Sequence, residues 1–166
     1  LVCIVGVRIV AATRPDAFRV ERSASIAAPP EKVFPLINDF ERWDAWSPWE
    51  KKDPAMKRTY SAVTSGKGAR YAWEGNGEVG QGSMEIVESA APSRVALKLD
   101  FVKPFEGHNR VDFPLEPRGG ATLVTWAMHG PMPYVSKVIS LFCNMNAMIG
   151  KEFEAGLASM KAAAEK

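Results

Sequence analysis

The chain has 166 residues, of which 46% are hydrophobic, and this is enough for one domain with a real core but too little for two. Because 21 Lys and Arg face 19 Asp and Glu, the net charge of +2 does not indicate a nucleic-acid-binding protein. Two distant cysteines, Cys3 and Cys143, and two histidines, His108 and His129, argue against a disulfide framework and a Cys- or His-based metal site. We therefore predict no metal and no cofactor, and nothing in the composition indicates an oligomeric state.

Residues 1–14 form an apolar segment that is interrupted only by Arg8, Thr13 and Arg14 and ends at Pro15. A membrane-spanning helix needs about 20 apolar residues, so this segment is too short on its own. Three interpretations stay open: the remnant of a truncated membrane anchor or signal segment, a strand, or a docked helix. If the segment is an anchor, the protein is tethered to a membrane through residues 1–14; otherwise we expect a cytoplasmic protein.

The domain predicted for residues 15–166 begins with a strand at Phe18–Ile26, which a proline pair ends. The second of these prolines suits the first turn of a short helix over Glu31–Asn38, which Pro35 should kink. A second short helical piece is predicted at Phe40–Trp49, which holds three of the five tryptophans.

The middle of the chain alternates between apolar and polar residues, with Gly and Pro at regular breaks. We predict six antiparallel strands here: Met56–Val63, Ala69–Glu74, Glu78–Glu88, Arg94–Lys103, His108–Leu115 and Ala121–Met128. After a further Gly and Pro break, apolar residues recur at helical spacing from Tyr134 to Lys166. This pattern predicts one long C-terminal helix, with Gly150 and Gly156 as its weak points.

The order of elements predicts an α+β fold in which a curved antiparallel sheet of six or seven strands wraps around the long C-terminal helix, with two short helices after the first strand. Such a sheet must bury one face, and only the last helix is long enough to cover it. Curvature around a single helix leaves a cavity between helix and sheet, closed at one end by the short helices.

Five segments resemble the START-like, helix-grip superfamily often called SRPBCC, and within it the bacterial members of polyketide cyclase/dehydrase type. They are WDAWSPWEKKDP (43–54), GARYAWEGNGEVGQGSMEI (68–86), LDFVKPFEGHN (99–109), TLVTWAMHGPMPY (122–134) and KEFEAGLASMK (151–161). The resemblance covers about residues 18–166. It implies a hydrophobic cavity and a family that binds lipids, polyketides or other apolar molecules, with cyclisation in a minority. No catalytic residue is shared across the superfamily, so none is assigned here.

Strand alternation predicts which side chains face the cavity. In Arg94–Lys103, for example, Leu99 and Phe101 share one face while Lys98 and Asp100 point the other way. The predicted ligand-binding residues are Trp43, Trp46, Tyr71, Trp73, Met84, Leu99, Phe101, Asn109, Phe113, Trp126, Met128, Met145 and Ile149. The alternative for each of them is that its side chain packs in the hydrophobic core and lines no cavity.

Three residues are weak candidates for chemistry. Asn109 is the one polar side chain that alternation places inward, either as a hydrogen-bonded strand-end residue or as a donor that orients a ligand. Tyr71 offers a hydroxyl at the end of an aromatic body. His108 points outward but titrates near neutrality. His129 is predicted to be an ordinary surface residue.

Two motifs do not lead to a function. Gly75 to Gly80 match the string GxGxxG, but a strand pattern follows instead of a helix, so nucleotide binding is not indicated. Glu74 and Glu78 flank the same turn and resemble a pair of glycosidase acids, although solvated hairpin carboxylates explain them better.

Three functional hypotheses remain. The first is binding of an apolar small molecule, lipid or polyketide-like, in the cavity. The second is a polyketide cyclase or dehydratase in which Tyr71, Asn109 or His108 handles a proton. The third is a membrane-proximal accessory domain.

The predicted cavity mouth lies at the first half of the C-terminal helix, from Tyr134 to Ile149, where Lys137 is the only charge and the apolar stripe is wider than one face needs. We place it beside the Trp43–Trp49 segment, with Pro131 and Pro133 in the entry loop. The alternative is that the extra apolar residues, Leu141 and Met148, pack as closed core.

Overall fold

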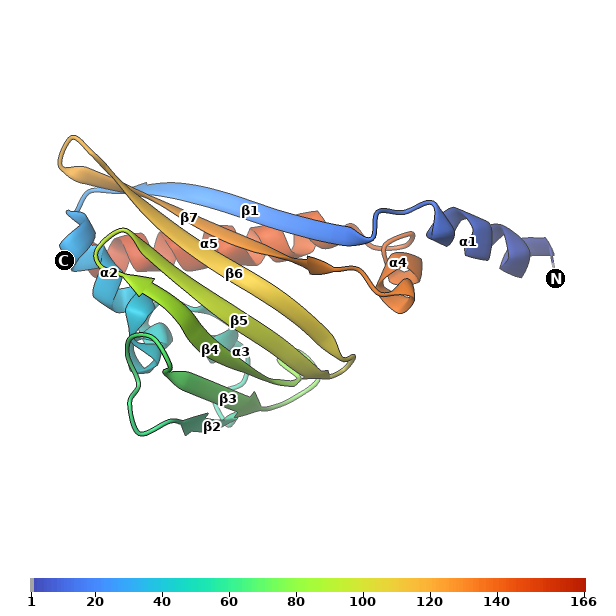
Figure 1. Ribbon diagram of the computed structural model, residues 1–166, viewed down its shortest axis with the longest axis horizontal. Helices are drawn as coiled ribbons and strands as arrows, with labels where there is room; N and C mark the ends of the chain where they lie inside the picture. The colour runs from blue at the N-terminus through green and yellow to red at the C-terminus, as the bar shows by residue number, and fades with distance from the viewer. Residues whose placement is uncertain (1) are drawn as a thin grey trace.

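The structure, a computed structural model, describes residues 2–166. One antiparallel sheet of seven strands, in the order β1-β7-β6-β5-β4-β3-β2, curves around the C-terminal helix α5 (Figure 1). The predicted α+β architecture is therefore confirmed. The elements are α1 (Val2–Ala12), β1 (Ala17–Ile26), α2 (Pro30–Asn38), the 3-10 helix η1 (Phe40–Ala45), α3 (Pro48–Lys52), β2 (Lys57–Tyr60), β3 (Arg70–Glu74), β4 (Gln81–Ala90), β5 (Arg94–Lys103), β6 (Gly107–Arg118), β7 (Ala121–Pro131), α4 (Tyr134–Ile139) and α5 (Met145–Ala164).

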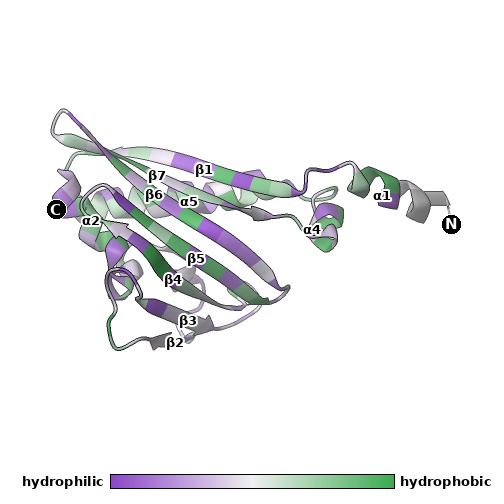
Figure 2. Cartoon of the chain, viewed as in Figure 1, coloured by the Kyte–Doolittle hydropathy of each residue, from purple (hydrophilic) through white to green (hydrophobic). Residues whose placement is uncertain are grey.

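Alternating side chains give the sheet its two faces, and Figure 2 shows apolar and polar residues following one another along β5 and β6. In β5, Leu97 is fully buried and Leu99 is 8% exposed, whereas Lys98 between them is exposed. Leu99 lies opposite Met84 of β4 and Asn109 of β6. Because this register continues across the strands, one face of the sheet is a continuous apolar surface turned toward α5.

The predicted single C-terminal helix is wrong: the chain forms α4, breaks at residues 140–144, and resumes as α5. Asn144 caps the second helix, since its side-chain oxygen accepts a hydrogen bond from the backbone N–H of Ala147 at 3.0 Å. Gly150 and Gly156 do not weaken α5, which is continuous through both. They are positions of close packing, against Arg22 and Trp126 respectively.

Other element boundaries also differ from the prediction. The Phe40–Trp49 piece forms part of two short helices, η1 and α3, so three short helices rather than two follow β1. β4 begins at Gln81, because the preceding residues form a loop in which the Asn76 side-chain oxygen accepts hydrogen bonds from the N–H groups of Glu78 and Val79, at 2.9 and 3.3 Å.

Helix α5 covers the outer edge of β1 as well as the face of the sheet. Its Asn146 donates a hydrogen bond to the Arg19 carbonyl at 3.3 Å, and its Lys161 donates one to the Ser25 carbonyl at 3.1 Å. Arg22 of β1 reaches back to Glu154 at 3.0 Å. These contacts fix the position of the helix above the sheet and so the depth of the space between them.

Residues 2–12 form helix α1, which projects away from the body of the domain beyond α4 (Figure 1). Ala11 is fully buried, whereas Ile9 and Val10 are 61% and 49% exposed. Among the described residues, no helix has the length and apolar content needed to span a membrane. That residues 15–166 form a domain separate from the preceding segment stays a prediction.

Candidate functional site

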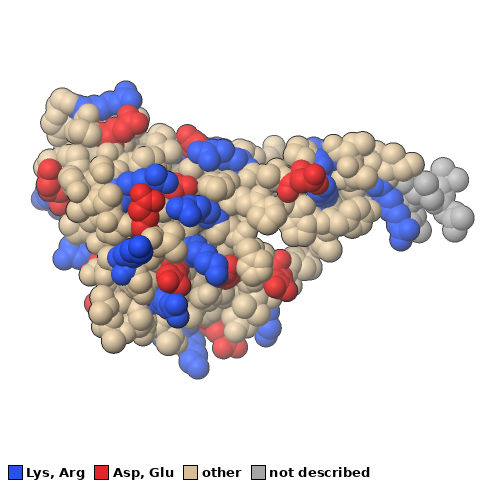
Figure 3. Space-filling view, in the orientation of Figure 1, with Lys and Arg blue, Asp and Glu red and all other residues tan. Residues whose placement is uncertain are grey.

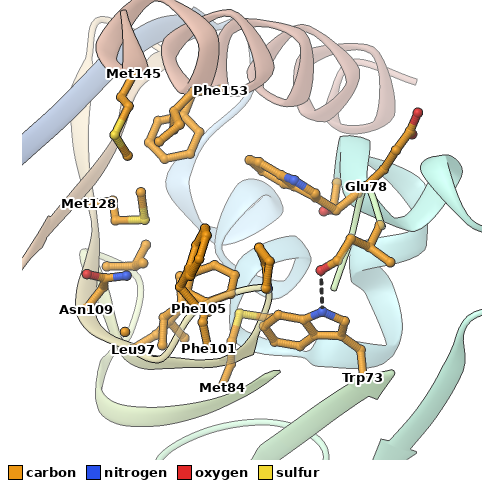
Figure 4. Close-up of a pocket in the computed structure, with 18 of the residues that line it drawn as sticks. Trp73, Glu78, Met84, Leu97, Phe101, Phe105, Asn109, Met128, Met145 and Phe153 are labelled. Carbon is orange, nitrogen blue, oxygen red and sulfur yellow. Dashed lines mark hydrogen bonds between the residues drawn. The ribbon is translucent and has the colours of Figure 1, made fainter. Parts of the chain in front are cut away.

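A cavity of about 400 Å³ lies between the sheet and α5. Met145 and Phe153 reach from α5 toward Met128 and Asn109 on the sheet, and Trp73, Met84 and Phe101 lie at its far side (Figure 4). The lining is made mostly of aromatic, methionine and branched side chains. Its size and apolar character fit those of small-molecule binding sites.

Most of the predicted ligand-binding residues come together in this cavity. Those that line it are Trp43, Tyr71, Trp73, Met84, Leu99, Phe101, Asn109, Trp126, Met128, Met145 and Ile149. Trp46 and Phe113 do not line it. Both are fully buried with their rings edge to face at 5.9 Å, and the Trp46 indole N–H donates to the Leu36 carbonyl at 2.7 Å. They form a packed layer behind the cavity wall. The sequence pattern predicts that a side chain points inward, but not whether it lines the cavity or packs behind the lining. That the eleven lining residues bind a ligand stays a prediction.

Four aromatic residues that are absent from the predicted ligand-binding set also line the cavity: Phe18, Trp49, Phe105 and Phe153. Phe153 stacks on Trp126 with ring centres 4.1 Å apart and an interplanar angle of 8°. Trp49 meets the edge of both rings, at 5.8 Å from Trp126 and 6.1 Å from Phe153. Phe153 is one of the apolar residues at helical spacing in the predicted C-terminal helix. The sequence does not show where along the sheet this helix lies, so it could not show that Phe153 reaches the cavity.

One corner of the cavity is polar. The Tyr71 hydroxyl donates a hydrogen bond to Glu50 Oε1 at 2.6 Å, and Arg58 Nε donates to Glu50 Oε2 at the same distance. The Glu50 side chain is only 8% exposed. A buried carboxylate requires such partners to remain charged. The sequence analysis missed Glu50 and Arg58, because they lie in α3 and in the edge strand β2, where no alternation pointed inward.

This corner keeps the Tyr71 hydroxyl protonated and makes it a weak acid. Burial, and then the hydrogen bond to Glu50 and its charge, raise the pKa of Tyr71 well above the usual value of a phenol. The hydroxyl is therefore neutral at physiological pH, and its proton is directed at Glu50. Its oxygen lone pairs are left to accept a hydrogen bond from a ligand.

Asn109 lies on β6, half-buried, and lines the cavity as predicted from alternation. Among the described residues, no hydrogen bond to its side-chain amide is formed. This favours an amide that is available to a ligand over one that is satisfied within the strand. Asn109 and the Tyr71 corner thus offer two separate polar contacts in an otherwise apolar space.

His108 is not a candidate for chemistry in the cavity. Its side chain is 62% exposed and does not line the cavity. On the outer face of the sheet, its Nδ1 lies 2.7 Å from Asp100 and its Nε2 lies 3.2 Å from Glu106. These hydrogen bonds raise the pKa of His108. His129 is also turned away from the cavity and lies 3.3 Å from Asp112.

The cavity opens between two sets of residues. One set, the hairpin rim, consists of Glu78, Pro104, Phe105 and Glu106, and the other, the helix rim, consists of Pro131, Pro133, Ser136 and Met145. Phe105 is 55% exposed, and the molecule is hollowed between its body and the α4 end (Figure 3). The hairpin rim was not foreseen, because no sequence pattern brings that loop opposite α4.

The predicted entry loop does border the cavity at Pro131 and Pro133, whereas Leu141 and Met148, the extra apolar residues of the predicted mouth, are not part of its lining. Leu141 lies in a separate groove that also includes residues of the 14–20 segment, and Met148 is 62% exposed, which contradicts the alternative that Met148 packs as closed core. The Trp43–Trp49 segment contributes to the wall of the cavity through Trp43, Ser47 and Trp49.

A metal site is not evident: within residues 2–166, no three His, Cys, Asp or Glu side chains are grouped so that they could hold an ion. The candidate site is therefore the apolar cavity itself, with Asn109 and the Glu50–Tyr71 pair as its polar contacts.

A seven-stranded sheet that grips one long helix over an apolar cavity defines the START-like, helix-grip class of proteins. The model of the family described as polyketide cyclase / dehydrase and lipid transport matches residues 17–165, and the chain belongs to this family, within the SRPBCC superfamily.

Solved structures of low sequence identity share the fold. A protein from Thermobifida fusca is 22% identical, with a TM-score of 0.64, covering 88% of this chain and 92% of its own. CalU16 from Micromonospora echinospora is 17% identical, with a TM-score of 0.61, covering 92% of this chain and 80% of its own. The Aha1 dimer from Colwellia psychrerythraea is 17% identical, with a TM-score of 0.64, covering 89% and 96%. No curated protein matches the sequence.

Proposed function

We propose that this protein binds a small apolar molecule, lipid or polyketide-like, in the cavity between the sheet and α5. The observation that carries the proposal is the lining: a space of about 400 Å³ bounded by aromatic, methionine and aliphatic side chains that come from β3 to β7 and α5. Close packing would normally fill such a volume in a core that serves only stability. A ligand supplies the contacts that the empty space lacks.

Binding without catalysis is favoured over a cyclase or dehydratase. General acid–base catalysis needs a group of suitable pKa within hydrogen-bonding reach of the substrate. Tyr71 is already committed to Glu50, and His108 lies on the outer face of the sheet. Asn109 orients a ligand but does not exchange a proton with it near neutral pH. Cyclisation by shape alone is the alternative function that this cavity also supports.

Filling the cavity tests the proposal. Leu99 is 8% exposed and lines the cavity, whereas Val102 is on the same strand, 59% exposed and outside the lining. We expect Leu99→Trp to abolish uptake of a neutral apolar dye such as N-phenyl-1-naphthylamine, measured by dye fluorescence, and Val102→Trp to leave it unchanged. Equal dye binding by folded Leu99→Trp protein would refute the cavity as the site.

A second candidate function, association with a membrane surface, is supported by the exposed apolar side chains near the mouth. They lie on α1, α4, the α4–α5 connection and the start of α5: Ile9, Val10, Tyr134, Val135, Phe142 and Met148. The charged residues of this region are mainly basic, with Arg8 and Arg14 exposed and Lys137 paired with Asp16. Apolar side chains beside positive charge suit an anionic bilayer surface.

The test of this second function is sedimentation with vesicles of anionic phospholipid. We expect the double variant Val135→Asp, Phe142→Asp to lose vesicle binding. Val63→Asp, at a residue that is 64% exposed on the β2–β3 connection, is the control and should bind like the wild type. Binding of the double variant at the wild-type level would exclude this surface.

A further inference from the structure

The charged side chains that line the cavity are all acidic. They are Glu50 in the wall and Glu78 and Glu106 on the hairpin rim, and no Lys, Arg or His is part of the described lining. Figure 4 shows Glu78 at the edge of the site. An apolar cavity whose charges have one sign is selective for the charge of what enters it.

The charged carboxylate of Glu50 lines the cavity, whereas its counter-ion, Arg58, does not. Arg58 donates from Nε to Glu50 Oε2, from Nη1 to the Met56 carbonyl at 2.9 Å and from Nη2 to the Glu50 carbonyl at 3.2 Å. All three guanidinium nitrogens are thus engaged with protein oxygens, and Arg58 does not line the cavity. A ligand meets the carboxylate of Glu50 and the hydroxyl oxygen of Tyr71, both of which can accept hydrogen bonds.

Within the described lining, an anionic ligand meets no cationic side chain. Burying a carboxylate without a cationic partner is strongly unfavourable, and at the polar corner it would also face the Glu50 charge. At the mouth the charged end would lie beside the hairpin rim, which carries the exposed carboxylates of Glu78 and Glu106. A hydroxyl, N–H or ammonium group can instead donate to Glu50 or Tyr71 while its apolar body fills the rest of the space.

Building on the proposed binding function, we propose that the cavity takes neutral or cationic apolar molecules whose polar end is a hydrogen-bond donor, and that it discriminates against carboxylates such as fatty acids. The donor end lies at the Glu50–Tyr71 corner. Asn109 contacts a second polar group of the ligand.

A series of ligands with one chain length tests this proposal. Decanol, decylamine and decanoate are each titrated at neutral pH against the full chain loaded with the neutral dye N-phenyl-1-naphthylamine. We expect decanol and decylamine to displace the dye at concentrations at least about tenfold lower than decanoate, which corresponds to the loss of one favourable polar contact. Equal or tighter binding of decanoate overturns the charge selectivity while leaving the cavity itself established. If neither the dye nor any of the three binds, the proposed function fails and the selectivity fails with it.

The variant Glu50→Gln tests whether the buried carboxylate is responsible for the selectivity. In Glu50→Gln, the Arg58 charge loses its carboxylate partner, so decanoate should gain at least about tenfold while decanol changes little. Glu116→Gln, at an exposed residue near the far end of β6, is the matched control and should keep the wild-type ratio.

The rim provides an independent variant if Glu50→Gln does not fold, which its urea unfolding curve will show. The double variant Glu78→Gln, Glu106→Gln changes only exposed side chains and should improve decanoate binding at low salt, an effect that high salt removes. An unchanged ratio of decanoate to decanol in the folded variants overturns the role of these carboxylates.

Discussion

Gly156 of α5 lies directly against the indole ring of Trp126. A Cβ atom at this position would be 2.7 Å from Cζ3 of Trp126 and 3.1 Å from Cδ of Pro48. Since Trp126 also stacks on Phe153, the missing side chain at Gly156 is what allows the helix to approach the cavity wall so closely. The glycine is thus a packing requirement of the site.

We expect Gly156→Ala to lower the free energy of unfolding by about 1–3 kcal/mol, the usual cost of overpacking a core. Alanine is favoured over glycine in a helix by about 1 kcal/mol, so a net loss would show that the clash with the ring outweighs helix propensity. Urea unfolding followed by tryptophan fluorescence measures the difference. Stabilisation of the variant would contradict the close approach.

Gly150→Ala in the same helix is the informative comparison. Its Cβ would meet the guanidinium of Arg22, which is the end of a flexible side chain and can move aside. We expect a smaller loss of stability than for Gly156→Ala, limited to the hydrogen bonds of Arg22 with Glu154 and Asn146. A larger loss would mean that Arg22 is held as rigidly as Trp126.

Tyr71→Phe removes the hydroxyl that hydrogen-bonds the buried Glu50. Hydrogen bonds to charged groups contribute about 1.5–3 kcal/mol, so we expect a loss of that order in the free energy of unfolding, measured in urea. Tyr60→Phe is the control: Tyr60 is 36% exposed and its ring lies 5.1 Å from that of Tyr71. It should cost clearly less, and equal losses would show that the hydrogen bond of Tyr71 to Glu50 adds no stability beyond that of an exposed tyrosine hydroxyl.

Tyr60 and Tyr71 should ionise at different pH values in an alkaline titration followed by ultraviolet absorbance. Burial and Glu50 raise the pKa of Tyr71, and burial and Glu50 raise that of Tyr60 as well, though Tyr71 is the more deeply buried. We expect Tyr71 to ionise after Tyr60, or only as the protein unfolds. Tyr71→Phe should remove the later of these two phases, and loss of the earlier phase instead would contradict this order of ionisation.

On the outer face, His108 and Asp100 form a pair whose protonation is linked. The protonated His108 ring donates hydrogen bonds to Asp100 and Glu106, and these raise the pKa of His108. The raised pKa stabilises the folded state below the ordinary histidine pKa of about 6.5, and this contribution is lost as the pH rises through the pKa of the folded state. Because His108 is exposed, the effect on stability is small.

NMR titration of the His108 ring should therefore show a pKa above the ordinary value that falls in Asp100→Asn. Glu116→Gln, a change of charge at the far end of β6, should leave the midpoint where it is. An unchanged midpoint in Asp100→Asn would show that this hydrogen bond does not form in solution.

Much of the fold followed from local patterns, and the errors have physical causes. Alternation in Arg94–Lys103 predicted the inward row correctly, because every strand of one sheet shares the same two faces. The helix break at residues 140–144 was missed, since the surrounding apolar residues keep helical spacing and only the Asn144 cap marks the new start.

The polar part of the site depended on tertiary contacts. Tyr71 was predicted from its own strand, but Glu50 and Arg58 reach it from α3 and β2, and their local sequence resembles an ordinary charged surface. Trp46 and Phe113 were predicted to bind a ligand, but they do not line the cavity. Large inward-facing aromatics are equally suited to the wall of a cavity and to the layer behind it, and only the packing around them decides.

The hydrogen bonds from α5 to the edge of β1 have a consequence for association between molecules. Asn146 and Lys161 occupy the carbonyls of Arg19 and Ser25, and Glu165 accepts from the N–H of Ala27 at 2.7 Å. Main-chain groups that are already bonded cannot template a strand from another chain. The opposite edge of the sheet, β2, is only 4 residues long. Both edges of the sheet, at β1 and β2, therefore resist the addition of a strand from another molecule and the aggregation that it initiates.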